Sequence, residues 1–322
     1  MRICLLTNQD LDSPTIREDD WPCDPRPFLP NEDWHLAVLG EKHEAATQVE
    51  VLIAQGFDLY FNLCDGAENQ LDTPGIEVIQ TLEKHGVPFT GATSACYEPT
   101  REEMKIACMK SGISTPKFVF AKTRYDIVMA NKHLEYPLFV KHYNSYASID
   151  LTPKSRVTCY KELVHQAEKM IRRHGACLIE EYIDGTEYTV LIAENPEDKS
   201  NPKVYPPVQY EFPEGETFKH SDLKWETFAG MKTFPVQDEV LADRLCNECA
   251  KFFVAMEQKS FGRCDVRVDK TGTPFILEIN SNCGVYFEKE AYGSADFCIA
   301  LDPNGHIGFT EQLAKVAFAR KT

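Results

Sequence analysis

The sequence predicts an α/β region followed by α+β regions, arranged as three consecutive domains. Three observations support this fold class. Strand and helix patterns alternate through the first third of the chain, a smaller block then mixes strands with helices, and strands dominate from Thr186 onward. A chain of 322 residues is long enough for two or three well-formed cores. We place the domain boundaries where the pattern changes, which gives domains at residues 1–95, 96–184 and 185–322.

The first domain is predicted from short apolar strands that alternate with helices. Residues 11–34 are rich in Asp, Glu and Pro and are not expected to form regular structure. The expected elements are a strand at 3–6, a helix at 41–55, a strand at 57–63, a helix at 73–85 and a strand with a turn at 87–91. The loop at 64–68 follows the carboxyl end of a strand, where α/β folds bind ligands, which makes Glu68 a candidate substrate residue.

The elements of the other two domains are predicted from the same hydrophobic periodicity and from the residues that end helices and strands. Gly112 is expected to end a helix that begins at Arg101. The further elements are strands at 117–121 and 136–142, a helix at 161–174, a strand at 177–182, a helix at 239–256, a hairpin at 261–280 and a last helix at about 310–320.

Composition excludes several classes of function. With 34 Lys and Arg against 50 Asp and Glu, the net charge of −16 argues against binding of nucleic acid or of anionic membranes. The first seven residues are too few for a signal peptide and no apolar run reaches 18 residues, so we expect a cytoplasmic protein. The twelve cysteines are scattered, and Cys246 and Cys249 lack a neighbouring Cys or His pair, so a zinc or redox role is not expected for them.

The hairpin at 261–280 is the most informative segment. Alternating apolar residues flank a Lys-Thr-Gly-Thr-Pro turn. Asp265 lies on the first strand, while Glu278 and Asn280 are two apart on the second and therefore share a face. Their oxygens suit Mg²⁺, which keeps substrate phosphates among its ligands. The alternative is a solvated edge hairpin, but carboxylates among apolar neighbours are costly unless a cation balances them.

Weaker signals precede the hairpin. Lys141 ends an apolar strand and is a candidate to neutralise phosphate, although a strand-end lysine is usually exposed to solvent. The backbone of residues 180–183 could offer N–H and C=O groups to an adenine edge, and Glu187 could bind ribose hydroxyls.

In this order and spacing, the segments resemble the ATP-grasp superfamily, and most closely its D-alanine–D-alanine ligase-like carboxylate–amine ligases. The resemblance runs over roughly residues 57–290 and is strongest at 137–142, 178–190 and 261–285. It implies a three-domain ATP-grasp fold, with ATP held between two antiparallel sheets of the central and C-terminal domains.

The resemblance also implies roles for single residues. Lys141 and Lys224 would contact the ATP phosphates, Glu180 and the backbone of 181–183 the adenine, and Glu187 the ribose. The complete ATP-binding set is Arg101, Lys141, Glu180, Glu181, Tyr182, Ile183, Glu187 and Lys224. Asp265, Glu278 and Asn280 would hold two Mg²⁺ ions, with Mn²⁺ as an alternative and Glu278 as the bridge. Arg263 and Gly284 would stabilise the acyl-phosphate and tetrahedral intermediates, and Ser148 would belong to the phosphate loop.

Departures from the family pattern concern mainly the organic substrates. Arg101 stands where a second ATP lysine is usual, with Lys105 one turn on, and Tyr146 replaces a phosphate-loop glycine. Lys289 occupies the position of the serine that grips the carboxylate of the second D-alanine. The N-terminal Ser-x-Glu segment that holds the first D-alanine is absent from residues 8–20. The ATP and metal half of the pattern is therefore kept, and the amino-acid half is not.

We therefore expect an ATP-dependent ligase that joins a small-molecule carboxylate to an amine through an acyl phosphate and releases ADP and phosphate. The substrate is expected to be an amino acid or a related molecule, but not D-Ala-D-Ala, and relatives suggest a homodimer. Two alternatives remain, an ATP-grasp small-molecule kinase and a non-catalytic nucleotide-binding regulatory protein. Arg263 and Gly284 favour the ligase over the kinase, and the three retained metal ligands favour an enzyme over a regulator.

Overall fold

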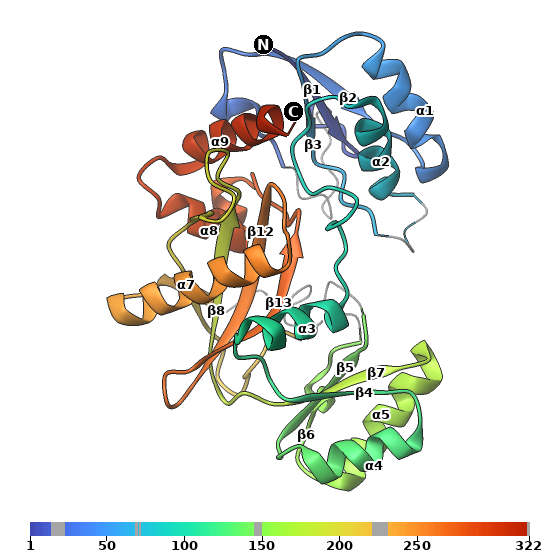
Figure 1. Cartoon of the computed structure of the whole chain (residues 1–322), viewed down its shortest axis with the longest axis vertical. Coiled ribbons are helices and arrows are strands. Elements are labelled where there is room, and N and C mark those ends of the chain that lie inside the picture. Colours follow the sequence, from blue (N-terminus) through green and yellow to red (C-terminus); the bar gives the residue numbers. More distant parts are fainter. Residues whose placement is uncertain (14–22, 68–69, 71, 145–149, 221–230, 321–322) are drawn as a thin grey trace.

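The computed structural model describes residues 1–13, 23–67, 70, 72–144, 150–220 and 231–320. Within these residues three β-sheets follow one another along the molecule (Figure 1). The sheet at the N-terminal end is parallel and the other two are antiparallel. This arrangement confirms the predicted combination of an α/β region with α+β regions.

The N-terminal sheet has the order β2-β1-β3, formed by β1 (Arg2–Thr7), β2 (Asp33–Val38) and β3 (Leu59–Asn62). Helices α1 (Lys42–Ile53) and α2 (Ile76–His85) pack together over one face through an apolar core that includes Val49 and Leu82. The C-terminal helix α9 (Gly305–Ala319) covers the other face, where Phe61 and Phe309 share a core (Figure 1). The two ends of the chain are thereby packed together.

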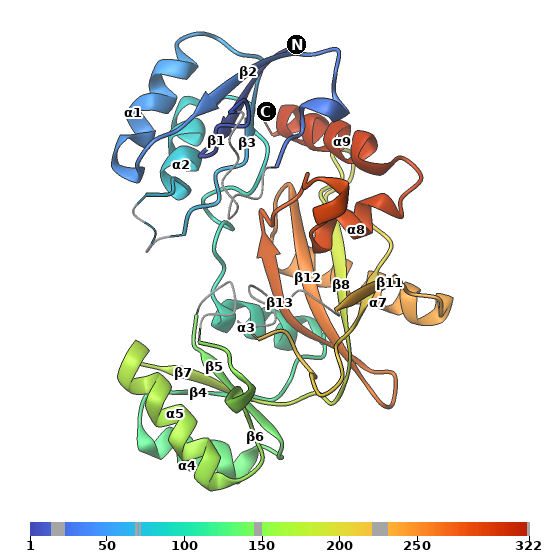
Figure 2. The ribbon, with the colours of Figure 1, turned by 180° about the vertical axis from the view of Figure 1, so that it is seen from behind.

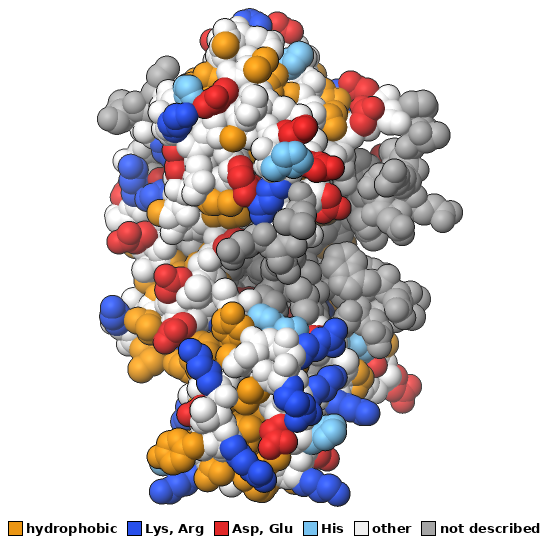
Figure 3. Space-filling model, turned by 90° about the vertical axis from the view of Figure 1, so that its right-hand side faces the viewer, with side chains coloured by type: hydrophobic (Ala, Val, Ile, Leu, Met, Phe, Trp, Pro, Cys, Tyr) orange, Lys and Arg blue, Asp and Glu red, His pale blue; other side chains and the backbone are white. Residues whose placement is uncertain are grey.

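The central sheet has the order β4-β7-β5-β6. Its strands are β4 (Phe118–Ala121), β5 (Leu138–His142), β6 (Arg156–Val157) and β7 (Cys177–Glu181). Helices α4 (Arg124–His133) and α5 (Tyr160–His174) cover one face. Figure 3 shows Lys and Arg side chains gathered at this end of the molecule. Two of them, Arg124 and Arg172, lie 3.9 and 3.7 Å from Glu168. These are surface ion pairs, which contribute little to stability.

The C-terminal sheet has the order β11-β10-β8-β12-β13, with β9 paired to β8, and Figure 2 shows it from behind. Its strands are β8 (Gly185–Ala193), β9 (Lys203–Val204), β10 (Val208–Glu211), β11 (Lys232–Pro235), β12 (Phe261–Asp269) and β13 (Pro274–Ser281). Val190 and Ile192 face a core with α3 (Arg101–Ser111) and α7 (Glu239–Ala255), whereas Leu191 and Ala193 face α8 (Ser294–Ala300) and α9. This alternation follows from the two-residue period of a strand.

The structure differs from the predicted elements in a few places. Strand β2 and helices α4 and α8 were not predicted, and β2 overlaps the segment 11–34 that was expected to be irregular. The segment 87–91 contributes only a bridge between Phe89 and Tyr60. Helix α2 begins at Ile76 because Pro74 and Gly75 stand before it. Helix α3 falls in the predicted range 96–184 but packs on α7 and β13, so the predicted domain boundaries remain to be tested.

All twelve cysteines are free thiols, and Cys4, Cys177 and Cys264 are buried in strands. Among the helices that the structure describes, none has the length and apolar character needed to cross a membrane.

Candidate functional site

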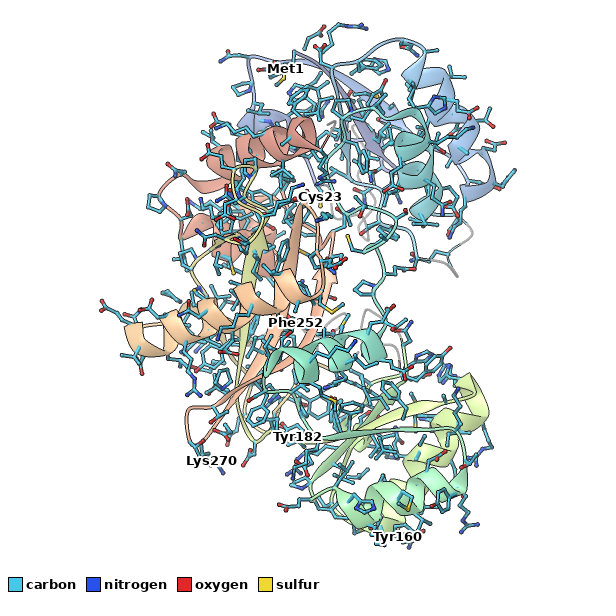
Figure 4. All side chains as sticks on the ribbon, viewed as in Figure 1. Met1, Cys23, Tyr160, Tyr182, Phe252 and Lys270 are labelled. Atoms are coloured by element: carbon cyan, nitrogen blue, oxygen red, sulfur yellow. The ribbon has the colours of Figure 1, made fainter. Side chains whose placement is uncertain are left out.

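Side chains from the central and C-terminal sheets meet around helix α3. Tyr182, at the end of β7, marks this junction (Figure 4), and its hydroxyl donates to the carbonyl of Thr217 at 2.9 Å. The guanidinium of Arg267 on β12 lies 4.8 Å from the Tyr182 ring centroid. Predicted site residues from several distant segments are therefore brought to one interface between two sheets.

The predicted metal hairpin forms as β12 and β13, with β13 at one edge of the sheet and β12 paired to β8. Asp265 and Glu278 are cross-strand partners in its register. Asp265 accepts two hydrogen bonds of 3.1 Å from Nε and Nη2 of Arg263, one of 3.1 Å from the Asn280 amide, and one of 3.0 Å from Thr189. Burial acts to raise the pKa of Asp265, but Arg263 and Lys219 outweigh it and hold the pKa at about 2. Asp265 is therefore a carboxylate at neutral pH.

Arg101 connects the hairpin to the central sheet. A capping box of Thr100 and Glu103 begins helix α3 and sets Arg101 at its first position, where the side chain is 8% exposed. Its Nη2 and Nε donate to Oε2 of Glu278 at 3.0 and 3.3 Å, and its Nη1 donates to the carbonyl of His142 at 2.8 Å. One guanidinium thus joins β13 to the end of β5, a geometry that the usual lysine cannot reproduce.

Glu180 lies between two lysines. Oε1 is 2.7 Å from Nζ of Lys141 and Oε2 is 3.0 Å from Nζ of Lys105. Burial acts to raise the pKa of Glu180, yet the two ammonium groups lower it to about 2. Lys141 is 6% exposed, so the alternative of a solvent-facing lysine is wrong.

Glu187 is also shared by two cations. It is 3.4 Å from Arg267 and 3.3 Å from Lys219, and the Lys219 ammonium sits 3.3 Å from the ring centroid of Tyr210. Sequence reasoning missed both cations. Arg267 was detectable, since it follows Arg263 and Asp265 at two-residue spacing on one strand face. Lys219 carried no such signal, because only the tertiary fold brings it to Glu187.

Part of the backbone of residues 181–183, at the end of β7, is already hydrogen-bonded within the central domain. The amides of Glu181 and Tyr182 donate to the carbonyls of Lys117 and Pro137, both at 2.9 Å. Ile183 follows as a half-buried residue. Contacts of residues 181–183 with adenine therefore remain a prediction.

Of the remaining predicted positions, the structure describes Gly284 and Lys289 and leaves the others outside the described residues. Gly284 and Lys289 are exposed, and Lys289 lies on a short 3₁₀ helix (Lys289–Ala291). A Cβ on Gly284 would come within 3.0 Å of the Phe287 ring, so this position favours glycine. Glu68, Ser148, Lys224 and Tyr146 lie outside the residues that the structure describes.

The donor set at the hairpin fits a hard divalent ion. Two carboxylates and an amide converge there, and Glu278 and Asp265 are each neutralised by an arginine that a metal ion would replace. The Asn280 amide would present its oxygen after turning over. Across the described residues no group of three or more His, Cys, Asp or Glu side chains is placed to hold a metal, so the amide is essential to this set.

The charge of the site is opposite to that of the chain. Six cations surround four carboxylates in its described part, an excess of two positive charges in a chain of net charge −16. His142 adds no charge, because burial, together with His174 and Arg101, lowers its pKa to about 4. Such a site favours a small polyanion.

Comparison with known families agrees with this geometry. Residues 108–287 match the family model described as D-ala D-ala ligase C-terminus. The chain belongs to this family. The uncharacterized protein y4sG of Sinorhizobium fredii is 31% identical over 249 residues, which are 72% of this chain and 68% of the relative. The D-alanine–D-alanine ligase of Laribacter hongkongensis is 26% identical over 79% of this chain and 76% of its own length. The D-alanine–D-alanine ligase of Pseudomonas entomophila is 26% identical over 63% of this chain and 61% of its own length.

Solved structures support the fold. A D-alanine–D-alanine ligase from Bacillus anthracis, complexed with ATP, matches with a TM-score of 0.70 and 18% identity over 100% of this chain and 98% of its own. VanG D-Ala:D-Ser ligase from Enterococcus faecalis matches with a TM-score of 0.62 and 18% identity over 81% of this chain and 73% of its own. The predicted resemblance to ATP-grasp ligases is confirmed, and with it the class of enzyme, an ADP-forming ligase that makes C–N bonds.

Proposed function

We propose that the enzyme joins the carboxylate of an amino acid or related small molecule to an amine, and that the product is not D-Ala-D-Ala. ATP first phosphorylates the carboxylate, giving an acyl phosphate and ADP. The amine then attacks the acyl carbon, phosphate leaves, and an amide forms. The observation that carries the proposal is the cationic interface between the two antiparallel sheets, where two positive charges remain in excess within an acidic chain.

Nucleotide binding is assigned to side chains on both sheets. Lys141 lies near the end of β5, and Arg101 donates a hydrogen bond to the carbonyl of His142, the last residue of that strand. Both would neutralise phosphates together with Lys224. Glu180 and the 181–183 linker would receive the adenine. Glu187 would hold the ribose, with Arg267 and Lys219 holding its carboxylate in place.

Asp265, Glu278 and Asn280 would hold two Mg²⁺ ions, and Glu278 would serve both. Bound there, the ions would neutralise charge on the transferring phosphoryl group. Arg263 now donates both hydrogen bonds of its fork to Asp265. The same fork of Arg263 would bind the acyl phosphate, and the backbone N–H of the exposed Gly284 would donate to the oxyanion.

Residue identities around the organic substrate support a product other than D-Ala-D-Ala. Lys289 stands where the family carries a serine, and its exposed ammonium suits an anionic group held at longer reach. The alternative for Lys289 is a solvated charge beside Glu288 and Glu290, which would contribute little. We place the activity in the cytoplasm, since free thiols in this number persist in reducing compartments.

Hydroxylamine trapping tests the proposal. Purified protein is incubated with ATP, Mg²⁺, pools of amino acids and hydroxylamine, and ADP and hydroxamate are measured together. A ligase that forms an acyl phosphate gives hydroxamate in step with ADP and identifies its carboxylate by mass spectrometry. A phosphorylated product without hydroxamate would indicate a kinase, and nucleotide binding without ADP formation would indicate a regulatory protein. Either result would overturn the proposed function.

A further inference from the structure

Lys105 is a fully buried lysine next to the predicted adenine site. It lies one turn along α3 from Arg101, and its side chain is 1% exposed. Its ammonium is 3.0 Å from Oε2 of Glu180 and donates to Oγ1 of Thr115 at 2.7 Å. Thr115 in turn donates to the carbonyl of Ile276 on β13 at 2.8 Å. Lys105 is therefore anchored to the C-terminal sheet while it contacts a carboxylate of the central sheet.

Lys141 approaches the same carboxylate from the central sheet itself. It stands on β5, the neighbour of β7, and its ammonium is 2.7 Å from Oε1 of Glu180. Two lysines thus share one buried carboxylate, although one cation suffices to neutralise it. A buried carboxylate with no cation is strongly unfavourable, so at least one of the two lysines must stay.

The two lysines differ in their freedom to leave. Lys105 is held by Thr115 and by its helix, which is packed in the core with Phe252 and Ile276. Burial lowers the pKa of Lys105, and the facing carboxylate partly offsets this effect. Lys141 lies at the end of a strand that leads toward the predicted phosphate loop. The anchored lysine is suited to stay, and the strand-end lysine to move.

We propose that Lys105 is a positioning residue that keeps Glu180 neutralised, so that Lys141 can turn from Glu180 to the phosphates of ATP. This inference rests on the proposed function, because it assigns Lys141 to the nucleotide. Without Lys105, Lys141 is the cation left beside Glu180 and remains paired with it. A glutamine at position 180 needs no cation, so it releases Lys141 even when Lys105 is absent.

The test is a double-mutant cycle read by nucleotide binding. Affinity for Mg²⁺ with a non-hydrolysable ATP analogue is measured by calorimetry for wild type, Lys105→Met, Glu180→Gln and the double variant. Lys105→Met should weaken binding at least tenfold, and adding Glu180→Gln should restore it to within about threefold of the Glu180→Gln single variant. Lys117→Met is the matched control, because Lys117 also pairs with a glutamate of β7, Glu181 at 3.4 Å, but its side chain is 65% exposed. It should bind like wild type.

Each outcome decides the matter. If Lys105→Met binds like wild type, or if the double variant binds at least tenfold more weakly than the Glu180→Gln single variant, Lys105 is a packing residue and the inference fails. Circular dichroism and thermal melting check the fold, and Lys105→Gln replaces Lys105→Met in the cycle if the latter does not fold. If wild type binds no nucleotide, the proposed function fails, which is a separate result from an unrestored double variant.

Discussion

Replacing Arg101 by glutamine should destabilise the metal-free protein and, at the same time, strengthen its binding of a divalent ion. Arg101 makes three side-chain hydrogen bonds, two to Glu278 and one to the carbonyl of His142. Removing one partner of a buried ion pair costs about 3–5 kcal/mol. The Glu278 side chain is 25% exposed, which places the expected loss at the low end, about 3 kcal/mol.

The same substitution leaves Glu278 without its cation. A metal ion then no longer competes with the guanidinium, so affinity for Mn²⁺ in the absence of nucleotide should rise at least tenfold, about 1.4 kcal/mol. Urea denaturation without metal measures the first effect, and titration of free Mn²⁺ by electron paramagnetic resonance measures the second. Adding Mn²⁺ should recover part of the lost stability, because the ion replaces the missing positive charge.

Arg124→Ala serves as the control, since Arg124 is exposed and lies 3.9 Å from Glu168. Its stability should stay within about 0.5 kcal/mol of wild type, with unchanged Mn²⁺ binding. If Arg101→Gln is as stable as wild type and binds Mn²⁺ no better, the pair between Arg101 and Glu278 does not balance the charge of the metal-free site and the reasoning is refuted.

Four further predictions follow from the same geometry. Glu278→Gln should fold but lose ATP turnover roughly a hundredfold, about 3 kcal/mol, and near-normal ADP release would remove Glu278 from the metal site. Arg263→Lys should keep nucleotide affinity by calorimetry and lose amide formation, whereas a parallel loss of both would make Arg263 a nucleotide or structural residue. Lys289→Ala should raise KM for one organic substrate and leave KM for ATP unchanged, and three unaltered constants would mark it as a surface residue. The lowered pKa of Asp265 contributes folding stability that is present above about pH 4 and is lost as the pH falls toward 2. In Asp265→Asn, the free energy of unfolding should therefore fall less steeply over this pH range, and an equally steep fall would contradict the assignment.

The hairpin shows what the sequence could predict. Its two alternating strands and its Gly-containing turn are local signals, and they place Asp265 on one strand and Glu278 on the next. The pairing of Asp265 with Glu278 depends on a register shift between Asp265 and Val266, which those local signals do not predict. Helix α3 was equally accessible, since Thr100 and Glu103 form its capping box and Gly112 ends it. Local signals of this kind fixed the fold class and most of the candidate metal ligands.

Other parts of the site depend on long-range contacts. Glu180 was predicted as an adenine contact, but its pairing with Lys105 requires helix α3 to pack between two sheets. Lys219 reaches Glu187 only because β8 and the segment before residue 221 fold together. Strand β2 was overlooked because it follows an Asp- and Pro-rich stretch and only part of it is buried. Periodicity reports which face of an element is buried, and not which distant charge will meet it.

Oxygen transfer tests the central claim most directly. Amino acids labelled with ¹⁸O in their carboxylates are supplied with ATP and Mg²⁺, and the phosphate released is analysed by mass spectrometry. If the carboxylate oxygen attacks the γ-phosphate and the amine then displaces phosphate, each phosphate carries one ¹⁸O atom from the carboxylate. Phosphate that carries no ¹⁸O, formed while amide accumulates, would contradict an acyl-phosphate intermediate.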